Sequence, residues 1–158
     1  MFRTKEDFLQ EWAVEKDLTI KVLDSLTDET LGQSIVEGHS SLGWLGWHLT
    51  TTIPFFASVV GIKNLETQTK EVPNQAATIL DTYNKISSDL LKEIKAEWTD
   101  EDFSEVIDFF GSPSPKGHVL RMLTSHQGHH RGQMTVLLRQ AGLPVPGIYG
   151  PTIEQQQK

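Results

Sequence analysis

Four long segments of the chain carry apolar residues at intervals of three and four, the spacing that places side chains on one face of an α-helix. We expect helices over about residues 5–26, 41–60, 75–97 and 115–141. The first is preceded by Thr4 and the second by Ser41, and hydroxyl side chains of this kind cap helix N-termini. Pro54 removes one backbone hydrogen bond from the second helix and predicts a bend there, with a break as the alternative.

The segments between these helices carry weaker signals. Asn74 predicts an N-cap for the third helix, and Gly142 with Pro144 beyond it predicts the end of the fourth. Residues 98–114 combine aromatic residues with a Gly-Ser-Pro-Ser run, which fits either a crossover loop or a short hairpin. Residues 143–151 are too rich in Pro and Gly for a helix, and we expect them to pack as an ordered strap.

Together these elements predict an all-α fold. The expected arrangement is an antiparallel four-helix bundle with a long crossover between the third and fourth helices and an irregular C-terminal tail. A chain of 158 residues, 37% of them hydrophobic, has the size and composition of one folded domain. We therefore expect a single domain over residues 1–158.

Charge and composition narrow the classes of partner. The net charge is −7 and no two Lys or Arg residues are adjacent, so the chain has little to neutralise nucleic acid or an anionic membrane surface. The absence of cysteine excludes disulfides, thiolate metal sites and a cysteine nucleophile. The sequence contains neither a signal core nor a run of about 18 apolar residues, which makes a cytoplasmic location the expectation.

Three histidines form the candidate site. His126 and His130 are four residues apart on the fourth predicted helix, so they lie on one face about one turn apart. That face is otherwise mostly apolar, as is the face of the second helix that carries His48, so all three imidazoles are expected to point into the bundle. Converging imidazoles can bind one Zn²⁺, Ni²⁺ or Fe²⁺ ion, and three protein ligands leave coordination positions open for water or substrate.

Each histidine also has a simpler interpretation, as a hydrogen-bonded core residue. His129 could replace His130 as a ligand, although it is turned about 100° around the helix. Gln133 could hydrogen-bond a ligand or a metal-bound water, or could bond a neighbouring helix. Arg131 is expected beside the histidine face, paired with a carboxylate such as one from the crossover.

Other catalytic templates are absent from the sequence. It contains no phosphate-binding glycine loop and no G-x-S-x-G turn, and Gln127 stands where an H-E-x-x-H motif requires Glu. The four tryptophans are interpreted as core or interface packing rather than as a cofactor site: Trp12, Trp44, Trp47 and Trp98.

The run Ser-His-Gln-Gly-His-His-Arg-Gly-Gln at 125–133, followed by Leu-Arg-Gln-Ala-Gly and a proline-rich tail, resembles the DinB/YfiT-like family of metal-binding four-helix bundles. In that family one histidine comes from the second helix and two come from the fourth, as H-x-x-x-H running into Arg-Gly-Gln. His48, within Trp-His-Leu, matches the first, and His126 and His130 match the others. The resemblance covers nearly the whole chain and implies a three-histidine metal site.

The same resemblance implies a function. Characterised relatives include S-transferases that use bacillithiol or mycothiol, and family members tend to form homodimers. A bound metal can lower the pKa of a small thiol so that the thiolate attacks a small electrophile. Two alternatives stay open: a hydrolase whose nucleophile is a metal-bound water, and a non-catalytic metal-binding stress-response protein. The sequence names neither the metal nor the substrate.

Overall fold

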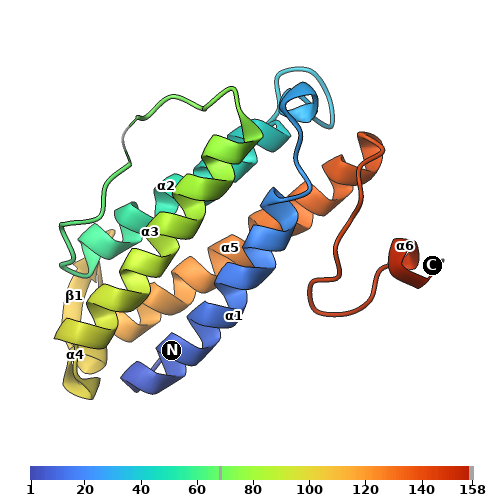
Figure 1. Ribbon diagram of the computed structural model, residues 1–158. Coiled ribbons are helices and arrows are strands. Elements are labelled where there is room, and N and C mark those ends of the chain that lie inside the picture. Colours follow the sequence, from blue (N-terminus) through green and yellow to red (C-terminus); the bar gives the residue numbers. More distant parts are fainter. Residues whose placement is uncertain (68, 157–158) are drawn as a thin grey trace.

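The computed structural model describes residues 1–67 and 69–156, and four long helices form a bundle (Figure 1). They are α1 (Lys5–Leu23), α2 (Leu42–Val59), α3 (Ala76–Glu97) and α5 (Lys116–Gln140). The shorter elements are a 3-10 helix, η1 (Asp28–Thr30), the helices α4 (Asp100–Ser104) and α6 (Ile153–Gln156), and the antiparallel strands β1 (Val106–Phe109) and β2 (Ser112–Pro115). The predicted all-α bundle is confirmed. The predicted domain also includes residues 68, 157 and 158, which lie outside the described residues.

The first two helices begin as the sequence indicates. Thr4 Oγ1 accepts a hydrogen bond from the Asp7 backbone N–H at 3.1 Å, and Ser41 Oγ accepts one from the Trp44 backbone N–H at 3.2 Å. Helix α2 continues through Pro54, so the alternative of a break is wrong.

The cap predicted for the third helix is wrong. Helix α3 begins at Ala76, and the side chain of Asn74 does not cap it. The Ala76 N–H instead donates to Asp28 Oδ1 at 2.7 Å, so a carboxylate from η1 satisfies an N-terminal backbone group of α3. Local sequence cannot reveal a cap that comes from 48 residues away.

The direction of the helices also differs from the prediction. Helices α2 and α3 run parallel, because Gly46 near the start of α2 packs against Ile79 near the start of α3. At the other end, Asn64 beyond α2 donates a hydrogen bond to Glu93 at 2.9 Å. The crossover therefore lies between the second and third long helices, not between the third and fourth (Figure 1). The 16 residues between α2 and α3 can span about 50 Å when extended, ample for a bundle of this length.

Residues 98–114 stay at one end of the bundle. They form α4 and most of the β1–β2 hairpin, so the hairpin interpretation is confirmed while α4 was not expected. This end also holds the N-terminus, where Phe2 N–H donates to Gly117 O at 3.1 Å. A Cβ at Gly117 would lie only 2.1 Å from the Phe2 carbonyl oxygen, so this close approach of α5 requires glycine.

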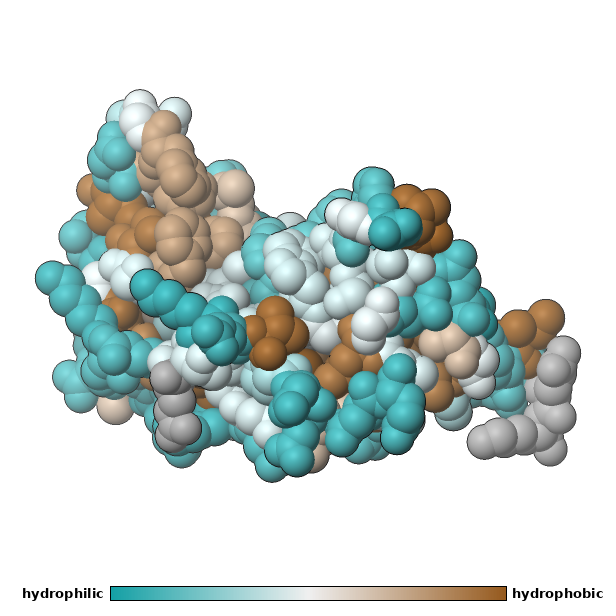
Figure 2. Space-filling model, turned by 90° about the horizontal axis from the view of Figure 1, so that it is seen from above, coloured by the Kyte–Doolittle hydropathy of each residue, from teal (hydrophilic) through white to brown (hydrophobic). Residues whose placement is uncertain are grey.

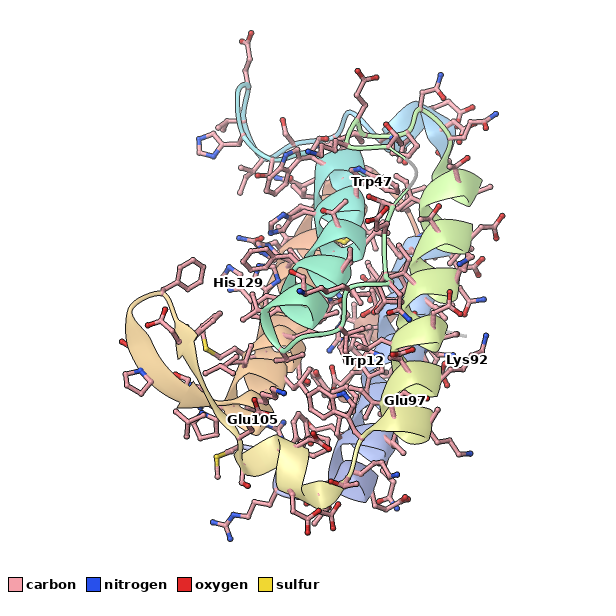
Figure 3. All side chains as sticks on the ribbon, turned by 90° about the vertical axis from the view of Figure 1, so that its left-hand side faces the viewer. Trp12, Trp47, Lys92, Glu97, Glu105 and His129 are labelled. Atoms are coloured by element: carbon pink, nitrogen blue, oxygen red, sulfur yellow. The ribbon has the colours of Figure 1, made fainter. Side chains whose placement is uncertain are left out.

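The core lies between the four long helices. Trp12, Trp47 and Trp98 are buried, as the packing interpretation requires, whereas Trp44 is 42% exposed. Figure 3 shows Trp12 and Trp47 between the helices and Lys92 pointing away from α3. Among the described residues, no helix is both long enough and apolar enough to cross a membrane.

The tail packs as an ordered strap, as predicted, before ending in the unexpected α6. Val145 is buried against the core, and Thr152 Oγ1 donates a hydrogen bond to Val145 O at 3.1 Å.

Candidate metal centre

The three candidate histidines meet between α2 and α5. His126 Nε2 lies 3.2 Å from His48 Nε2 and 3.1 Å from His130 Nε2. Within the part of the chain that the structure describes, His48, His126 and His130 form a group whose ligand atoms all lie within 4.8 Å of one another. The sequence places these residues together because His126 and His130 are one turn apart and α2 packs along α5.

The neighbours of the site fix the orientation of two rings. Gln133 Oε1 lies 2.7 Å from His130 Nδ1, so the ring donates its Nδ1–H to this oxygen and turns an unprotonated Nε2 toward the centre. Trp44 stacks on His48, with ring centroids 4.6 Å apart and an interplanar angle of 12°. Both contacts hold the Nε2 atoms in the geometry that a shared ligand requires.

The protein alone does not satisfy this cluster. His126 Nδ1 is buried and has no hydrogen-bond partner among the residues that the structure describes. His126 Nε2 faces the Nε2 atoms of both His48 and His130, yet a neutral imidazole carries only one N–H. Two imidazole nitrogens that each lie about 2.0–2.1 Å from one ion are separated by slightly more than 3 Å, which matches the observed spacing. The residues therefore fit a divalent metal ion, whose identity the donor set leaves open.

The protonation of the cluster favours metal binding. Desolvation by burial lowers the pKa of all three histidines, with further lowering from the neighbouring rings. The effect is largest for His126, whose pKa falls to about 4. At neutral pH the three rings are therefore uncharged, which is the form that binds a metal.

The prediction that the histidines point into the bundle core is correct only in part. All three are half-buried, and their neighbours along the same faces are partly solvent-exposed, namely Trp44 and Phe55 on α2 and Met122 on α5. The cluster therefore sits at the surface seam between two helices. On α5 the face that points to the core is centred one residue beyond the predicted one, because the fully buried position is Gln127 and not His126.

Gln127 links the two helices directly behind the histidines, a role that the sequence analysis missed. Its Nε2 donates to Leu49 O at 3.0 Å, and its Oε1 accepts from the Tyr83 hydroxyl at 3.1 Å. Leu49 and Gln127 each follow a candidate ligand by one residue, so this bond sets the register of α2 against α5. In the sequence, Gln127 is only a polar residue beside the apolar face of its helix. Its contacts with α2 and α3 depend on how the helices pack, which the sequence pattern does not give.

Comparison with known proteins agrees with this geometry. The family model described as the DinB family matches residues 1–158. The chain belongs to the DinB family. It is 43% identical over 159 residues to the uncharacterized protein YrdA of Bacillus subtilis strain 168, a match that covers 100% of this chain and 95% of that protein.

Two solved structures of DinB-like proteins share the fold. One, from Bacillus cereus ATCC 10987, matches with a TM-score of 0.89 and 49% identity, covering 94% of this chain and 100% of that chain. The other, YjoA from Bacillus subtilis, matches with a TM-score of 0.73 over 92% of this chain and 99% of that chain. At 17% identity the second likeness supports the fold alone.

In this DinB-family protein Arg131 lies apart from the histidines. It is 1% exposed, and it pairs with the carboxylate of Glu15 on α1. It also donates to Glu15 O at 2.8 Å and Thr19 Oγ1 at 2.9 Å, and to the hydroxyl of Tyr149 in the tail. The predicted pairing with a carboxylate is confirmed, but the carboxylate comes from Glu15 on α1 and not from the crossover, because Arg131 points toward α1 on the other side of α5.

The other histidines are exposed. His129 contacts the His130 ring with centroids 4.9 Å apart but lies outside the converging group, and Figure 3 places it on the outer side of α5. His118 and His39 are exposed as well.

An aromatic lobe borders the metal centre of this DinB bundle on the hairpin side. Phe110 is 82% exposed at the β1–β2 turn and stacks on Phe55 of α2 at 6.3 Å, while Phe56 lies 6.0 Å from the His126 ring. Figure 2 shows a raised apolar lobe at the end of the molecule that carries β1 in Figure 1, with a hollow beside it. Trp44 and Phe55 stay partly exposed in the single chain, and the homodimer stays a prediction.

Proposed function

We propose that this protein is a metal-dependent S-transferase that joins a small thiol to a small electrophile. The observation that carries the proposal is the convergence of three neutral, half-buried imidazoles at the seam between α2 and α5. Membership of the DinB family supports it, because the resemblance described above implies a three-histidine metal site and S-transferase activity in that family.

The accessibility of the centre favours catalysis over a structural role. Structural zinc sites are usually closed by four protein ligands, whereas catalytic sites keep a position open. Here three side chains converge, and each is partly accessible to solvent. A thiol could therefore reach the centre from the surface.

The proposed reaction is a substitution at carbon. The thiol loses its proton to solvent, its sulfur forms a bond to the electrophilic carbon, and the leaving group departs with the electron pair of the broken bond. A divalent ion bound here supplies Lewis acidity, which lowers the pKa of a thiol and makes the thiolate available at neutral pH. The protein's own part is to hold the rings, through Trp44 on His48 and Gln133 on His130.

The test is a thiol-dependent assay with monochlorobimane as the electrophile. Protein loaded with Zn²⁺, Ni²⁺ or Fe²⁺ is given bacillithiol, mycothiol or cysteine, and the fluorescent thioether is measured. We expect a rate above the uncatalysed one with at least one thiol, lost in His126→Ala and after chelation, and retained in His118→Ala. No acceleration with any thiol would contradict the proposal, and thiol-independent ester hydrolysis would support the hydrolase alternative instead.

A further inference from the structure

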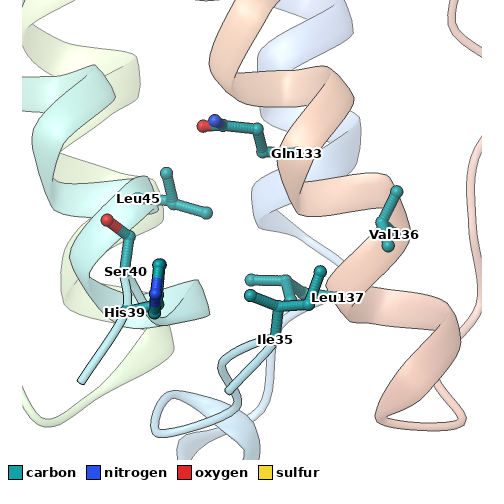
Figure 4. A pocket seen from close by; sticks show the side chains of 7 residues that line it. All are labelled: Ile35, His39, Ser40, Leu45, Gln133, Val136 and Leu137. Carbon is teal, nitrogen blue, oxygen red and sulfur yellow. The ribbon is translucent and has the colours of Figure 1, made fainter. Parts of the chain in front are cut away.

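A cavity opens one helical turn from the metal centre. It has a volume of about 230 Å³ and lies between α2, α5 and the loop that precedes α2 (Figure 4). Leu45 and Gln133 both line it. Leu45 precedes His48 by three residues on α2, and Gln133 follows His130 by three on α5, so the cavity continues the seam beyond the histidines. Gln133 joins the two, because its Oε1 contacts His130 Nδ1 at 2.7 Å.

The lining is apolar on most sides. Ile35, Leu45, Val136 and Leu137 contribute hydrocarbon, and polar groups come from His39, Ser40 and Gln133. Ile35 is 57% exposed and Val136 is 47% exposed, so two β-branched side chains at the cavity leave about half of their surface in solvent. A ligand with apolar surface would bury them, which is favourable in water.

The wall formed by the loop is held in place before any ligand arrives. The backbone N–H of Leu42 donates to Gln33 O at 2.9 Å, and that of Gly43 donates to Leu31 O at 2.8 Å. Ser34 and Ser41 form a bridge across the base of the loop. Because these bonds close the loop at its base, the cavity is largely preformed, as small-molecule sites usually are.

We propose that this cavity binds a short apolar group of the substrate, while the reactive end of the substrate lies at the three histidines. An apolar cavity of about 150 Å³ is large enough to bind benzene. At about 230 Å³ this cavity has room for a benzene ring with a substituent or for a short alkyl chain. The proposal deepens the proposed function, because it defines the electrophile or thiol as a small molecule with one apolar arm.

The first part of the test needs no metal. Metal-free protein with labelled Ile, Leu and Val methyl groups is titrated with 1-hexanol and followed by NMR. We expect saturable shifts at Ile35, Val136 and Leu137 and none at Val106, which is exposed on β1. Val136→Trp fills the cavity from a partly exposed position and should abolish the shifts at Ile35, whereas Val106→Trp should not. Absence of shifts at these methyl groups, or shifts that survive in Val136→Trp, would overturn the proposal.

The second part links the cavity to the centre. Protein loaded with Co²⁺ is titrated with acetohydroxamate and hexanohydroxamate, which share one metal-binding group, and binding is read from the visible spectrum. Each buried methylene improves affinity by roughly fourfold, so hexanohydroxamate should bind at least about tenfold tighter, and Val136→Trp should remove most of that ratio. Equal affinities would overturn this proposal and leave the S-transferase proposal standing. Hexanol binding without any uptake of metal would leave the apolar cavity standing and contradict the S-transferase proposal.

Discussion

Two faces of helix α5 differ in the partners that they offer to buried and half-buried polar side chains. Toward α1, Arg131 is fully buried and finds a carboxylate, a carbonyl and two hydroxyls as partners. Toward α2, one residue earlier in the chain, His130 joins two other imidazoles that crowd their nitrogens together and leave His126 Nδ1 without a partner among the described residues. One helix thus carries an arginine paired with a carboxylate, although its Nε also lacks a partner among the described residues, and a cluster of imidazoles that face one another.

The difference distinguishes buried polar residues that stabilise the fold from polar residues that are available to a ligand. A buried charge is tolerated when the fold supplies an opposite charge, as Glu15 does for Arg131. Three neutral imidazoles that the fold brings together are instead a donor set that could hold a metal ion. Changes on the Arg131 face should therefore reduce stability, while changes on the histidine face should reduce metal binding.

The largest expected effect is on the structural face. Arg131→Met leaves the buried Glu15 carboxylate with the Tyr149 hydroxyl as a donor but without its charged partner, and should lower the free energy of unfolding by about 3–5 kcal/mol. Arg121→Met is the matched control, since Arg121 also pairs α5 with α1, through Glu11, but is about one-third exposed. The control should cost at most about 1 kcal/mol. Denaturant titration of both variants measures this, and equal losses would contradict a special role for burial.

Gln127→Met should have a smaller effect on stability but should reduce both stability and metal affinity. It leaves the Tyr83 hydroxyl and Leu49 O without their bonds, which should lower the free energy of unfolding by about 1–3 kcal/mol. Because the bond sets the register of α2 against α5, metal affinity should fall as well. Gln140→Met, exposed at the end of the same helix, is the control for chemical denaturation and metal titration. A stability loss with unchanged affinity would show that Gln127 does not position the histidines.

Gln133→Leu tests the histidine face alone. It removes the acceptor of the His130 Nδ1–H, and loss of such a partner typically weakens metal affinity by 10–100-fold. Since Gln133 is exposed, the stability of the metal-free protein should change by less than about 0.5 kcal/mol. Gln133→Glu keeps an acceptor and should retain affinity in a competition titration with a chelator. Identical affinities for the Leu and Glu variants would argue against this orienting bond.

The smallest effect is the pH dependence of the metal-free protein. The pKa of His126 is about 4 in the folded state and 6.5 in its ordinary range, so the folded chain binds fewer protons than the unfolded chain between these values. The free energy of unfolding should therefore fall as pH is lowered from about 6.5 toward 4. His126→Gln should flatten this slope, and His118→Gln should not. Urea melts at several pH values measure it, and a slope unchanged in His126→Gln would refute the assignment.

The elements that sequence could predict were those with local causes. Helical spacing and the caps at Thr4 and Ser41 placed the long helices within a few residues, and the H-x-x-x-H pair brought His126 beside His130. What failed depends on packing between distant segments. The cap from Asp28, the parallel arrangement of α2 and α3, and the position of the crossover have no local signature.

The same limit applied to the site. Sequence placed the histidines on a mostly apolar face, but the depth of that face depends on how α2 meets α5, which decides that Gln127 is buried and the histidines half-buried. The partner of Arg131 was likewise misassigned, because Glu15 lies 116 residues away on a helix whose neighbours were unknown. Hydrophobic periodicity shows which residues share one face of a helix, but the contacts of that face depend on how the helices pack together.

The most direct test of the account is the metal content of protein purified without an affinity tag, measured by elemental analysis after chelation and reloading. The account predicts about one divalent ion per chain in the wild type, lost in His48→Ala and in His126→Ala, and retained in His118→Ala and His129→Ala. The three-histidine centre would be contradicted if the wild type takes up no metal, or if the His126→Ala variant still binds an ion.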